Sequence, residues 1–435
     1  MERLLLRWLW HLRPVWLSLL AVGLVMLPIA WSPSAQWQTE TARPAADFVN
    51  SVGVATHLRY LDTAYKHYDD IIKPRLLELG VHHIRDGGKN KGFYEKLNDL
   101  ASYGIRATLV MDPRDGLTPD NAIAEGLQPV LGAVEAVEGP NEWDVHPKLR
   151  YQGLAFPDGV RNYQTGLYRA LKANPDTQNL PVLLPSLAIP ENGRKLGKLE
   201  AGDMGNMHSY AGGNLPSQDL DTRWIPQTQA VTGPDKPLVA TECGWHTAVS
   251  DRRASQPGVP EEVVGRYAPR LALEYFNRGI VRSFLYQLID ERKAEKQEQR
   301  FGLLRNDGTP KPAFTSLKNL LALLEDGGSV VAPQTMQYYL SGDTKQVHHT
   351  LLQKSDGRFY LVLWQEVPGF GLRNRKVLSP AAKTVTLNLA QPFVTANTYL
   401  PLESETAIAS FTNGAQLSLS VPDHPLVVEL VPRTA

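Results

Sequence analysis

The chain has 435 residues, which predicts two or three domains rather than one small core. Lys plus Arg and Asp plus Glu each total 45, so the formal net charge is zero. That balance argues against a nucleic-acid-binding protein, which would need a basic stripe on its surface. Cys243 is the single cysteine, so an internal disulfide is excluded and a cysteine-rich zinc site is not expected.

The first 36 residues differ in kind from the rest. Arg3, Arg7 and Arg13 precede an apolar run over residues 15–31, and the next charge is Glu40. A basic start followed by an apolar run predicts export, with the basic end retained in the cytoplasm. Residues 1–36 are therefore expected to be a signal peptide or an N-terminal membrane anchor. Poor cleavage sites favour the anchor, and we expect the protein to be periplasmic or extracellular.

A polar linker is expected over residues 32–46, and the next segment, 45–326, alternates between strand and helix patterns. Strands are predicted at residues 48–56, 81–86, 105–112, 134–142, 181–186, 204–210, 237–242 and 280–287. Helices are predicted at residues 68–79, 93–103, 121–131, 163–173, 261–277 and 312–324. Several helices stop at a glycine, as helix C-termini commonly do. Eight strands alternating with helices predict a (β/α)₈ TIM barrel of the α/β class.

The segment 329–435 has an all-β pattern. Short alternating runs predict strands at residues 336–340, 347–353, 358–364, 384–389, 397–399, 416–421 and 426–431. Turn residues such as Asn413-Gly414 separate these runs. We expect a small β-sandwich domain that packs beside the barrel and contributes few or no catalytic residues.

Two glutamates lie at the strand ends where a barrel of this kind carries its functional residues. Functional residues of such barrels lie at the C-terminal ends of the strands. Glu142 ends the fourth predicted strand and Glu242 ends the seventh, so their carboxyl groups are expected to face one mouth. A retaining glycosidase needs two carboxyl groups about 5 to 5.5 Å apart, one as acid/base and one as nucleophile. Such an acid must keep its proton near neutral pH, which requires a less polar site or a neighbouring carboxylate.

Other polar residues at the strand ends complete the candidate active site. Arg85 would lower the pKa of the nucleophile, and Asn141 would hydrogen-bond the sugar hydroxyl beside the reacting carbon. Tyr210 would position the nucleophile. His208 would contact the substrate or support a neighbouring group, and Tyr286 belongs to the same mouth.

Two tryptophans follow the same strand ends. Trp143 comes directly after Glu142, and Trp245 lies three residues after Glu242. Both are candidates for stacking against a sugar, with burial in the core as the alternative.

These residues resemble glycoside hydrolase clan A, with families 5 and 39 as the nearest comparison. The resemblance rests on Arg85, Asn141-Glu142, His208-x-Tyr210 and Glu242, and on the stretch 301–313 after the eighth strand. It implies that Glu142 is the acid/base and Glu242 the nucleophile of a retaining hydrolase acting on an extracytoplasmic poly- or oligosaccharide. Tyr286-Gln287 departs from the pattern, because that position is often Trp in the clan.

Two other functions compete with this interpretation. One is a membrane-tethered, catalytically inactive carbohydrate-binding barrel, although neither glutamate nor the asparagine is missing. The other is a metal-dependent hydrolase, which needs His or Asp ligands at the strand ends. His82 and His83 are adjacent on one strand, so their side chains point to opposite faces. We therefore expect no metal, no cofactor and no nucleic-acid partner.

Overall fold

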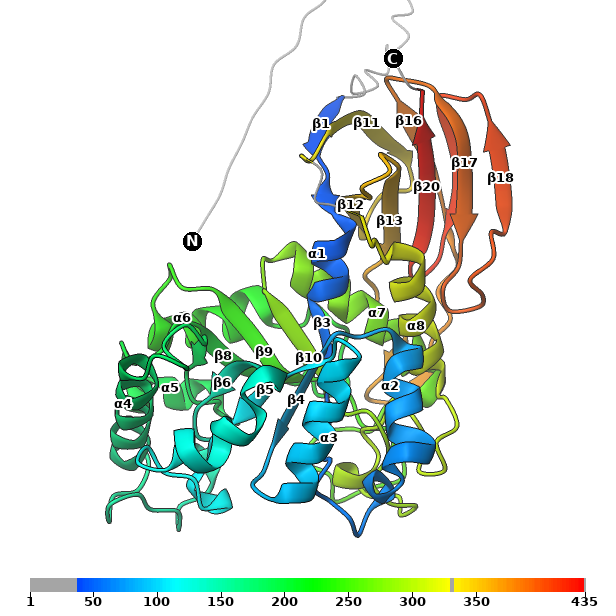
Figure 1. Cartoon of the computed structure of the whole chain (residues 1–435). Coiled ribbons are helices and arrows are strands. Elements are labelled where there is room, and N and C mark those ends of the chain that lie inside the picture. Colours follow the sequence, from blue (N-terminus) through cyan, green and yellow to red (C-terminus); the bar gives the residue numbers. More distant parts are fainter. Residues whose placement is uncertain (1–36, 329–331, 434–435) are drawn as a thin grey trace, which may run out of the picture. The chain divides into compact units, whose positions relative to one another are not determined.

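A computed structural model describes residues 37–328 and 332–433, and its first part is a barrel (Figure 1). Eight parallel strands form one sheet in the order β7-β6-β5-β4-β3-β10-β9-β8. A bridge between Leu183 and Met204 joins the two edge strands, so the barrel is nearly closed. The strands are β3 (Val52–Ala55), β4 (His83–Gly87), β5 (Arg106–Val110), β6 (Val134–Glu138), β7 (Val182–Leu183), β8 (Gly205–Ser209), β9 (Leu238–Cys243) and β10 (Arg282–Leu285). The predicted (β/α)₈ fold is confirmed.

Helices cover the outside of this sheet. They are α1 (Ala45–Asn50), α2 (Lys73–Leu79), α3 (Lys91–Ser102), α4 (Asp158–Ala173), α5 (Gly193–Leu196), α6 (Ile225–Thr232), α7 (Glu261–Asn277) and α8 (Pro312–Leu324). Helix α2 ends at Gly80, whose φ of 76° is left-handed, as the sequence predicts for a glycine after a helix.

Several predicted elements differ from the structure. The helix expected at 68–79 begins as a π-helical turn, Tyr68–Ile72, and becomes α-helical only in α2. Residues 48–50 were expected in the first strand but belong to α1, because Phe48 and Val49 are buried on one face of a short helix that begins after Pro44. The helix expected at 121–131 is a π-helical turn, Ala122–Leu127, followed by a 3-10 helix, Gln128–Ala133. Pro129 has no N–H to donate and its ring crowds the preceding turn, which disfavours a continuous α-helix at this point.

The second part is a β-sandwich of two sheets, as predicted, and their strand pairs are antiparallel except for the short parallel pair of β12 with β2. One sheet has the order β1-β11-β16-β19 and the other β18-β17-β20-β13-β12-β2. The C-terminal strands are β11 (Thr335–Gly342), β12 (Val347–Gln353), β13 (Phe359–Gln365), β14 (Phe370–Gly371), β15 (Lys376–Val377), β16 (Lys383–Leu389), β17 (Phe393–Tyr399), β18 (Ala409–Thr412), β19 (Gln416–Val421) and β20 (Leu426–Pro432).

The N-terminal end of the described chain also belongs to the sandwich. β1 (Gln38–Thr41) pairs with β11, and β2 (Arg43–Pro44) pairs with β12. Figure 1 shows β1 beside β11 although they are far apart in sequence. The linker expected over residues 32–46 is thus wrong for residues 38–44, which form two edge strands.

Helix α7 lies between the barrel and the sandwich. Its residues from Val263 to Phe276 are all buried, including Arg266, Arg270 and Glu274. Each of these three charges meets a sandwich residue, Asp423, Glu366 and His348 respectively. A buried charge is tolerated only when it is paired, so these ion pairs fix the sandwich to one side of the barrel.

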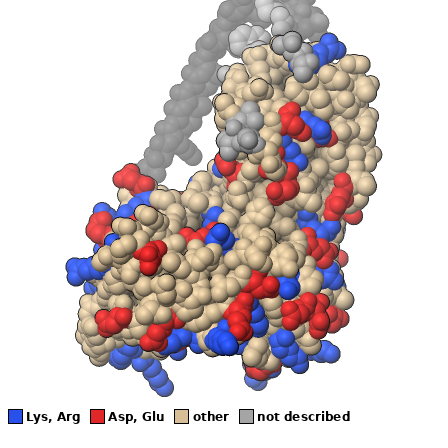
Figure 2. Space-filling model, viewed as in Figure 1, with Lys and Arg blue, Asp and Glu red and all other residues tan. Residues whose placement is uncertain are grey.

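Acidic and basic side chains are interspersed on the visible face of the described chain (Figure 2). Within the described residues, the helices are all too short or too polar to cross a membrane. The predicted signal or anchor, residues 1–36, lies outside the described residues.

Candidate active site

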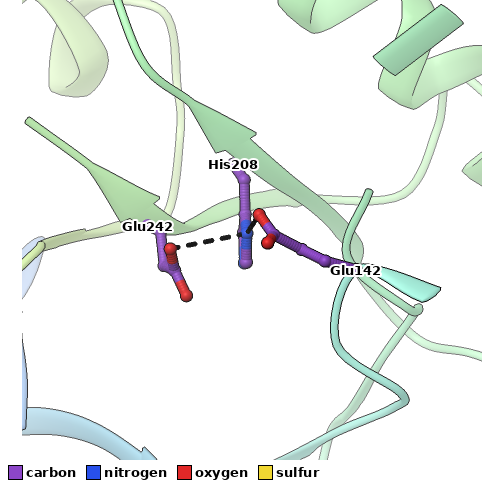
Figure 3. A group of neighbouring side chains, drawn as sticks. All are labelled: Glu142, His208 and Glu242. Atoms are coloured by element: carbon purple, nitrogen blue, oxygen red, sulfur yellow. Dashed lines mark hydrogen bonds and ion pairs between the residues drawn. The ribbon is translucent and has the colours of Figure 1, made fainter. Parts of the chain in front are cut away.

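Glu142 and Glu242 face each other across the barrel mouth, with His208 between them (Figure 3). One donor atom from each of the three residues lies within 4.8 Å of the others. His208 Nδ1 is 2.6 Å from Glu142 Oε1 and 3.6 Å from Glu242 Oε2. The structure therefore brings the two predicted glutamates together at one site.

A tight turn presents the Glu142 carboxyl to this mouth. Strand β6 ends at Glu138, and Glu142 has a left-handed φ of 53°. Asp112 Oδ2, at the end of β5, accepts hydrogen bonds from the Asn141 N–H and from Trp143 Nε1, both at 3.0 Å. Left-handed backbone is unfavourable for a residue with a β-carbon, and these two bonds hold the turn in that conformation.

Glu242 lies within β9 and is only 8% exposed. Its Oε1 accepts a hydrogen bond from Arg85 Nη1 at 2.5 Å, and its Oε2 accepts one from the Tyr210 hydroxyl at 2.6 Å. These two hydrogen bonds fix the orientation of the Glu242 carboxyl group in the mouth. Arg85 and Tyr210 therefore occupy the positions that the sequence predicts for them.

Arg85 has a second acidic partner, Glu138, which the sequence analysis did not single out. Glu138 is 0% exposed and accepts from Arg85 Nε and Nη2 at 2.8 Å each. Burial alone would lower the pKa of Arg85, but the Glu138 and Glu242 carboxylates outweigh it and raise that pKa. A glutamate inside an otherwise apolar strand needs a cation beside it. The run Val-Glu-Ala-Val-Glu therefore already indicated that Glu138 would be buried and paired with a cation.

Replacing Arg85 by Met should destabilise the protein by about 3 to 5 kcal/mol, because Glu138 would remain buried without its cation. Thermal and urea unfolding measure this loss. The double variant Arg85→Met, Glu138→Gln removes both charges and should recover much of the stability. If the double variant were as unstable as the single one, packing rather than the buried charge would be the cause.

The orientation of His208 is set by strand β9. Its Nε2 lies 3.1 Å from Thr241 Oγ1, which also lies 2.6 Å from Asn206 Oδ1. If Thr241 donates its proton to Asn206, its oxygen accepts from His208 Nε2, and Nδ1 then shares one proton with Glu142. His208 is thus held against Glu142 and is only 1% exposed.

The protonation of the His208–Glu142 pair differs from the expectation for an acid. Burial raises the pKa of Glu142, but the positive charge of His208 outweighs burial, so the pKa is lowered from its usual value. Burial likewise lowers the pKa of His208, but the Glu242 and Glu142 carboxylates outweigh it and raise that pKa. The two groups shift each other in opposite directions, so the pair as a unit keeps one proton to a higher pH than a lone glutamate.

A cavity of about 640 Å³ opens above the two carboxyl groups. His57, Tyr60 and Tyr286 line one side, and the His57 ring stacks on Tyr60 with centroids 4.5 Å apart. The Tyr286 hydroxyl lies 3.1 Å from His57 Nε2, and burial lowers the pKa of His57 to about 3. The ring is therefore neutral at physiological pH, which leaves an aromatic wall beside the carboxyls.

The structure brings most of the predicted residues to this cavity. Those that line it are Arg85, Asn141, Glu142, His208, Tyr210, Glu242 and Tyr286. Trp143 and Trp245 do not line it, and each is only 2% exposed. Trp143 is held by Asp112, and Trp245 Nε1 donates to the Asn214 carbonyl at 3.0 Å. Their predicted place against a sugar is corrected to the core, because both indoles are used to anchor loops.

Several lining residues were missed from the sequence, among them Trp224 and Glu298. Trp224 comes from a π-helical turn before α6, a region where no element was predicted, and it lies beneath the Arg223 guanidinium at 4.5 Å. Glu298 comes from the charged stretch 290–300, for which the sequence analysis predicts no strand or helix. Burial raises the pKa of Glu298, and the carboxylates of Glu242 and Glu142 add to the shift. Neither stretch has a pattern that marks it as part of the mouth.

The donor atoms of Glu142, His208 and Glu242 are of the kinds that can hold a divalent cation. Their surroundings already carry positive charge, since Arg85 binds Glu242 and His208 is paired with Glu142. A bound cation would have to displace both of these contacts. The geometry therefore favours proton chemistry by the two carboxyl groups.

Comparisons with known proteins identify the architecture. No family model matches the sequence, and no curated protein matches it. Solved structures do match: a family 39 glycoside hydrolase from Bacteroides cellulosilyticus WH2 has a TM-score of 0.54 at 15% identity, covering 90% of this chain and 81% of that one. A glucosidase from Croceicoccus marinus has a TM-score of 0.59 at 11% identity, covering 92% of this chain and 99% of that one.

The fold is therefore a (β/α)₈ barrel followed by a β-sandwich, an architecture that this chain shares with these two solved structures. The two matches extend over both parts of the chain. At such low identity the likeness establishes the fold, and the chemistry has to be argued from the site.

Proposed function

We propose that the protein is a retaining glycoside hydrolase. One observation supports this most directly: a carboxylate oxygen of Glu142 lies within 4.8 Å of one of Glu242. Retaining enzymes place their carboxyl groups about 5 to 5.5 Å apart, whereas inverting enzymes need about 6.5 to 9.5 Å to admit a water. The proposed substrate is a poly- or oligosaccharide, in keeping with the glycoside hydrolases that share the fold.

Each glutamate has the surroundings that its proposed role needs. Glu242 is held by Arg85 and Tyr210, which fix the carboxylate as a nucleophile against the sugar carbon. Glu142 shares a proton with His208, and the pair would deliver it to the leaving oxygen. The same pair would then accept a proton from the water that cleaves the glycosyl-enzyme.

Product stereochemistry tests this proposal. A panel of nitrophenyl glycosides identifies an accepted sugar, and NMR of the first product then gives its anomeric configuration. We expect retention, and we expect a 2-fluoro glycoside to label Glu242, as read by peptide mass. Inverted product would contradict the double displacement. Binding of oligosaccharides without any turnover would favour a carbohydrate-binding barrel instead.

The basic limb of the pH profile of kcat/KM should depend on His208. In the native protein the active form carries one proton on the His208–Glu142 pair, and that proton is lost only above the raised pKa of His208. In His208→Asn the only proton is the one on Glu142, a carboxyl group with a lower pKa than an imidazole. The basic limb should therefore move to lower pH by about two units, the separation between the ordinary pKa values of a histidine and a glutamate. Rates measured from about pH 4 to 9 give the limb.

The matched control is His67→Asn, which replaces an exposed histidine. This variant should keep the native profile. An unchanged basic limb in His208→Asn would show that the group that titrates is not the pair.

We further propose that the protein acts outside the cytoplasm, as the basic and apolar N-terminal sequence predicts. A fusion of the full chain to alkaline phosphatase, which is active only after export, tests this location. A full-length fusion that is produced but shows no phosphatase activity would contradict it.

A further inference from the structure

The sandwich reaches the two loops that form one wall of the cavity. The first loop, 210–219, follows β8 and contributes Tyr210 and Gly212 to the lining. The second loop, 244–260, follows β9 and contributes Ser255 and Gln256. Both loops are contacted from behind by residues 366–378, here called the bracing segment, which follow β13 and include the β14–β15 hairpin.

Glu366 holds the first loop. Its Oε1 accepts a hydrogen bond from the Ser217 N–H at 3.0 Å, while its Oε2 binds Arg270 Nε at 2.8 Å and Nη2 at 2.6 Å. Arg270 lies on α7 and is fully buried. One carboxylate therefore ties a loop of the barrel mouth to a buried helix and to the sandwich.

Leu372 packs between the two loops. A β-carbon on Gly213 would lie 2.7 Å from Leu372 Cδ2 and 3.3 Å from Pro257 Cβ. The Leu372 side chain therefore occupies the space that a side chain at position 213 would need. Gly213 has a positive φ of 88°, which only glycine adopts readily. The first loop thus follows a path that leaves room for a sandwich leucine.

Two further contacts extend the brace to the second loop. Arg375 Nη1 donates to the Val249 carbonyl at 2.8 Å. The Gly369 N–H donates to the Tyr267 hydroxyl at 2.7 Å, and the Tyr267 ring lies 5.2 Å from that of Trp245. Trp245 in turn binds the first loop through the Asn214 carbonyl. The bracing segment therefore contacts each loop directly and also the tryptophan that joins them.

We propose that the bracing segment is a positioning element of the active site: it holds the wall formed by the two loops and so sets how firmly substrate binds. This inference rests on the proposed glycosidase function. Neither Glu366 nor Leu372 lines the cavity, so both act through the loops and not on the reacting atoms.

The test uses the full-length protein with the variants Leu372→Ala, Arg375→Ala, Glu366→Ala and Glu366→Gln. The first readout is hydrogen exchange of the backbone amides in residues 211–219 and 244–257. We expect faster exchange in the first loop for Leu372→Ala and Glu366→Ala, and in the second loop for Arg375→Ala. Glu366→Gln keeps an oxygen for the Ser217 N–H and should retain most of the protection.

The second readout is kinetic. If the wall is loosened, substrate binding has to order it, and this ordering costs free energy. KM should therefore rise by about three- to tenfold while kcat stays within about twofold. Leu340→Ala and Arg358→Ala are matched controls, because these residues lie in the sandwich away from the loops. They should leave both exchange in the loops and KM unchanged.

Several results would overturn the proposal. Unchanged exchange in the loops for Leu372→Ala and Arg375→Ala would show that the segment does not hold the wall. An equal rise of exchange in Leu340→Ala would show general destabilisation, and faster exchange without a change in KM would refute the link to binding. If the native protein hydrolyses no glycoside, the proposed function fails, while exchange still decides whether the brace exists.

Discussion

Replacing Glu242 by alanine will abolish turnover of every glycoside that the native protein accepts. The substitution removes the nucleophile, so no glycosyl-enzyme forms even from a substrate with a good leaving group. The expected loss of kcat is on the order of 10⁶-fold, the scale seen when a catalytic nucleophile is removed. Arg85 would still be paired with Glu138, so the fold should persist in this variant.

Replacing Glu142 by alanine will have a smaller and substrate-dependent effect. Protonation of the leaving group matters little for a nitrophenol, so the glycosyl-enzyme should still form and then accumulate. The base for the second step is also gone, so overall turnover should fall by about 10² to 10⁴-fold. A burst of nitrophenol followed by slow release measures both steps.

Azide distinguishes the two glutamates, because it is a nucleophile that needs no base. It should restore turnover of Glu142→Ala and give a glycosyl azide of retained configuration. With Glu242→Ala any rescue should give inverted product, since azide would then attack the sugar directly. The opposite pair of stereochemical results would mean that the two roles are exchanged.

The barrel and the glutamate pair could be predicted because both depend on local patterns. A short apolar run followed by Asn141-Glu142 or Glu242 marks a strand together with the polar residues at its C-terminal end. Glycines after the predicted helices marked the C-terminal ends of those helices. These signals need no knowledge of which strands are neighbours.

The features that were missed depend on contacts between distant segments. Trp143 and Trp245 follow strand ends as a stacking residue would, yet Asp112 and Asn214 draw them into the core. Trp224 and Glu298 reach the cavity from stretches without periodicity. Strands β1 and β2 form only because the C-terminal sandwich offers edges for them to pair with. Such placements are set by tertiary packing, which a single sequence does not display.

Removing the chain after residue 329 will leave a barrel that does not stay folded and soluble. The main hydrophobic core runs continuously from helices α7 and α8 into the sandwich, where it includes Tyr360, Trp364 and Val427. Truncation would expose the apolar face of α7 and leave strand β1 without its partner β11. An exposed apolar patch and an unpaired strand edge both promote aggregation. Sedimentation and circular dichroism of the truncated protein measure this outcome.

A point variant tests whether the interface between the barrel and the sandwich is responsible for the stability of the barrel. Trp364 is fully buried, and its Nε1 donates to Glu274 of α7 at 2.9 Å. Trp364→Ala in the full chain should cost about 3 to 5 kcal/mol of stability and lower the unfolding midpoint without changing the site. A truncated barrel that is soluble and as active as the native protein would refute this view. It would also mean that Glu366, Leu372 and Arg375 are not needed to hold the cavity wall, so this deletion tests the bracing segment as well.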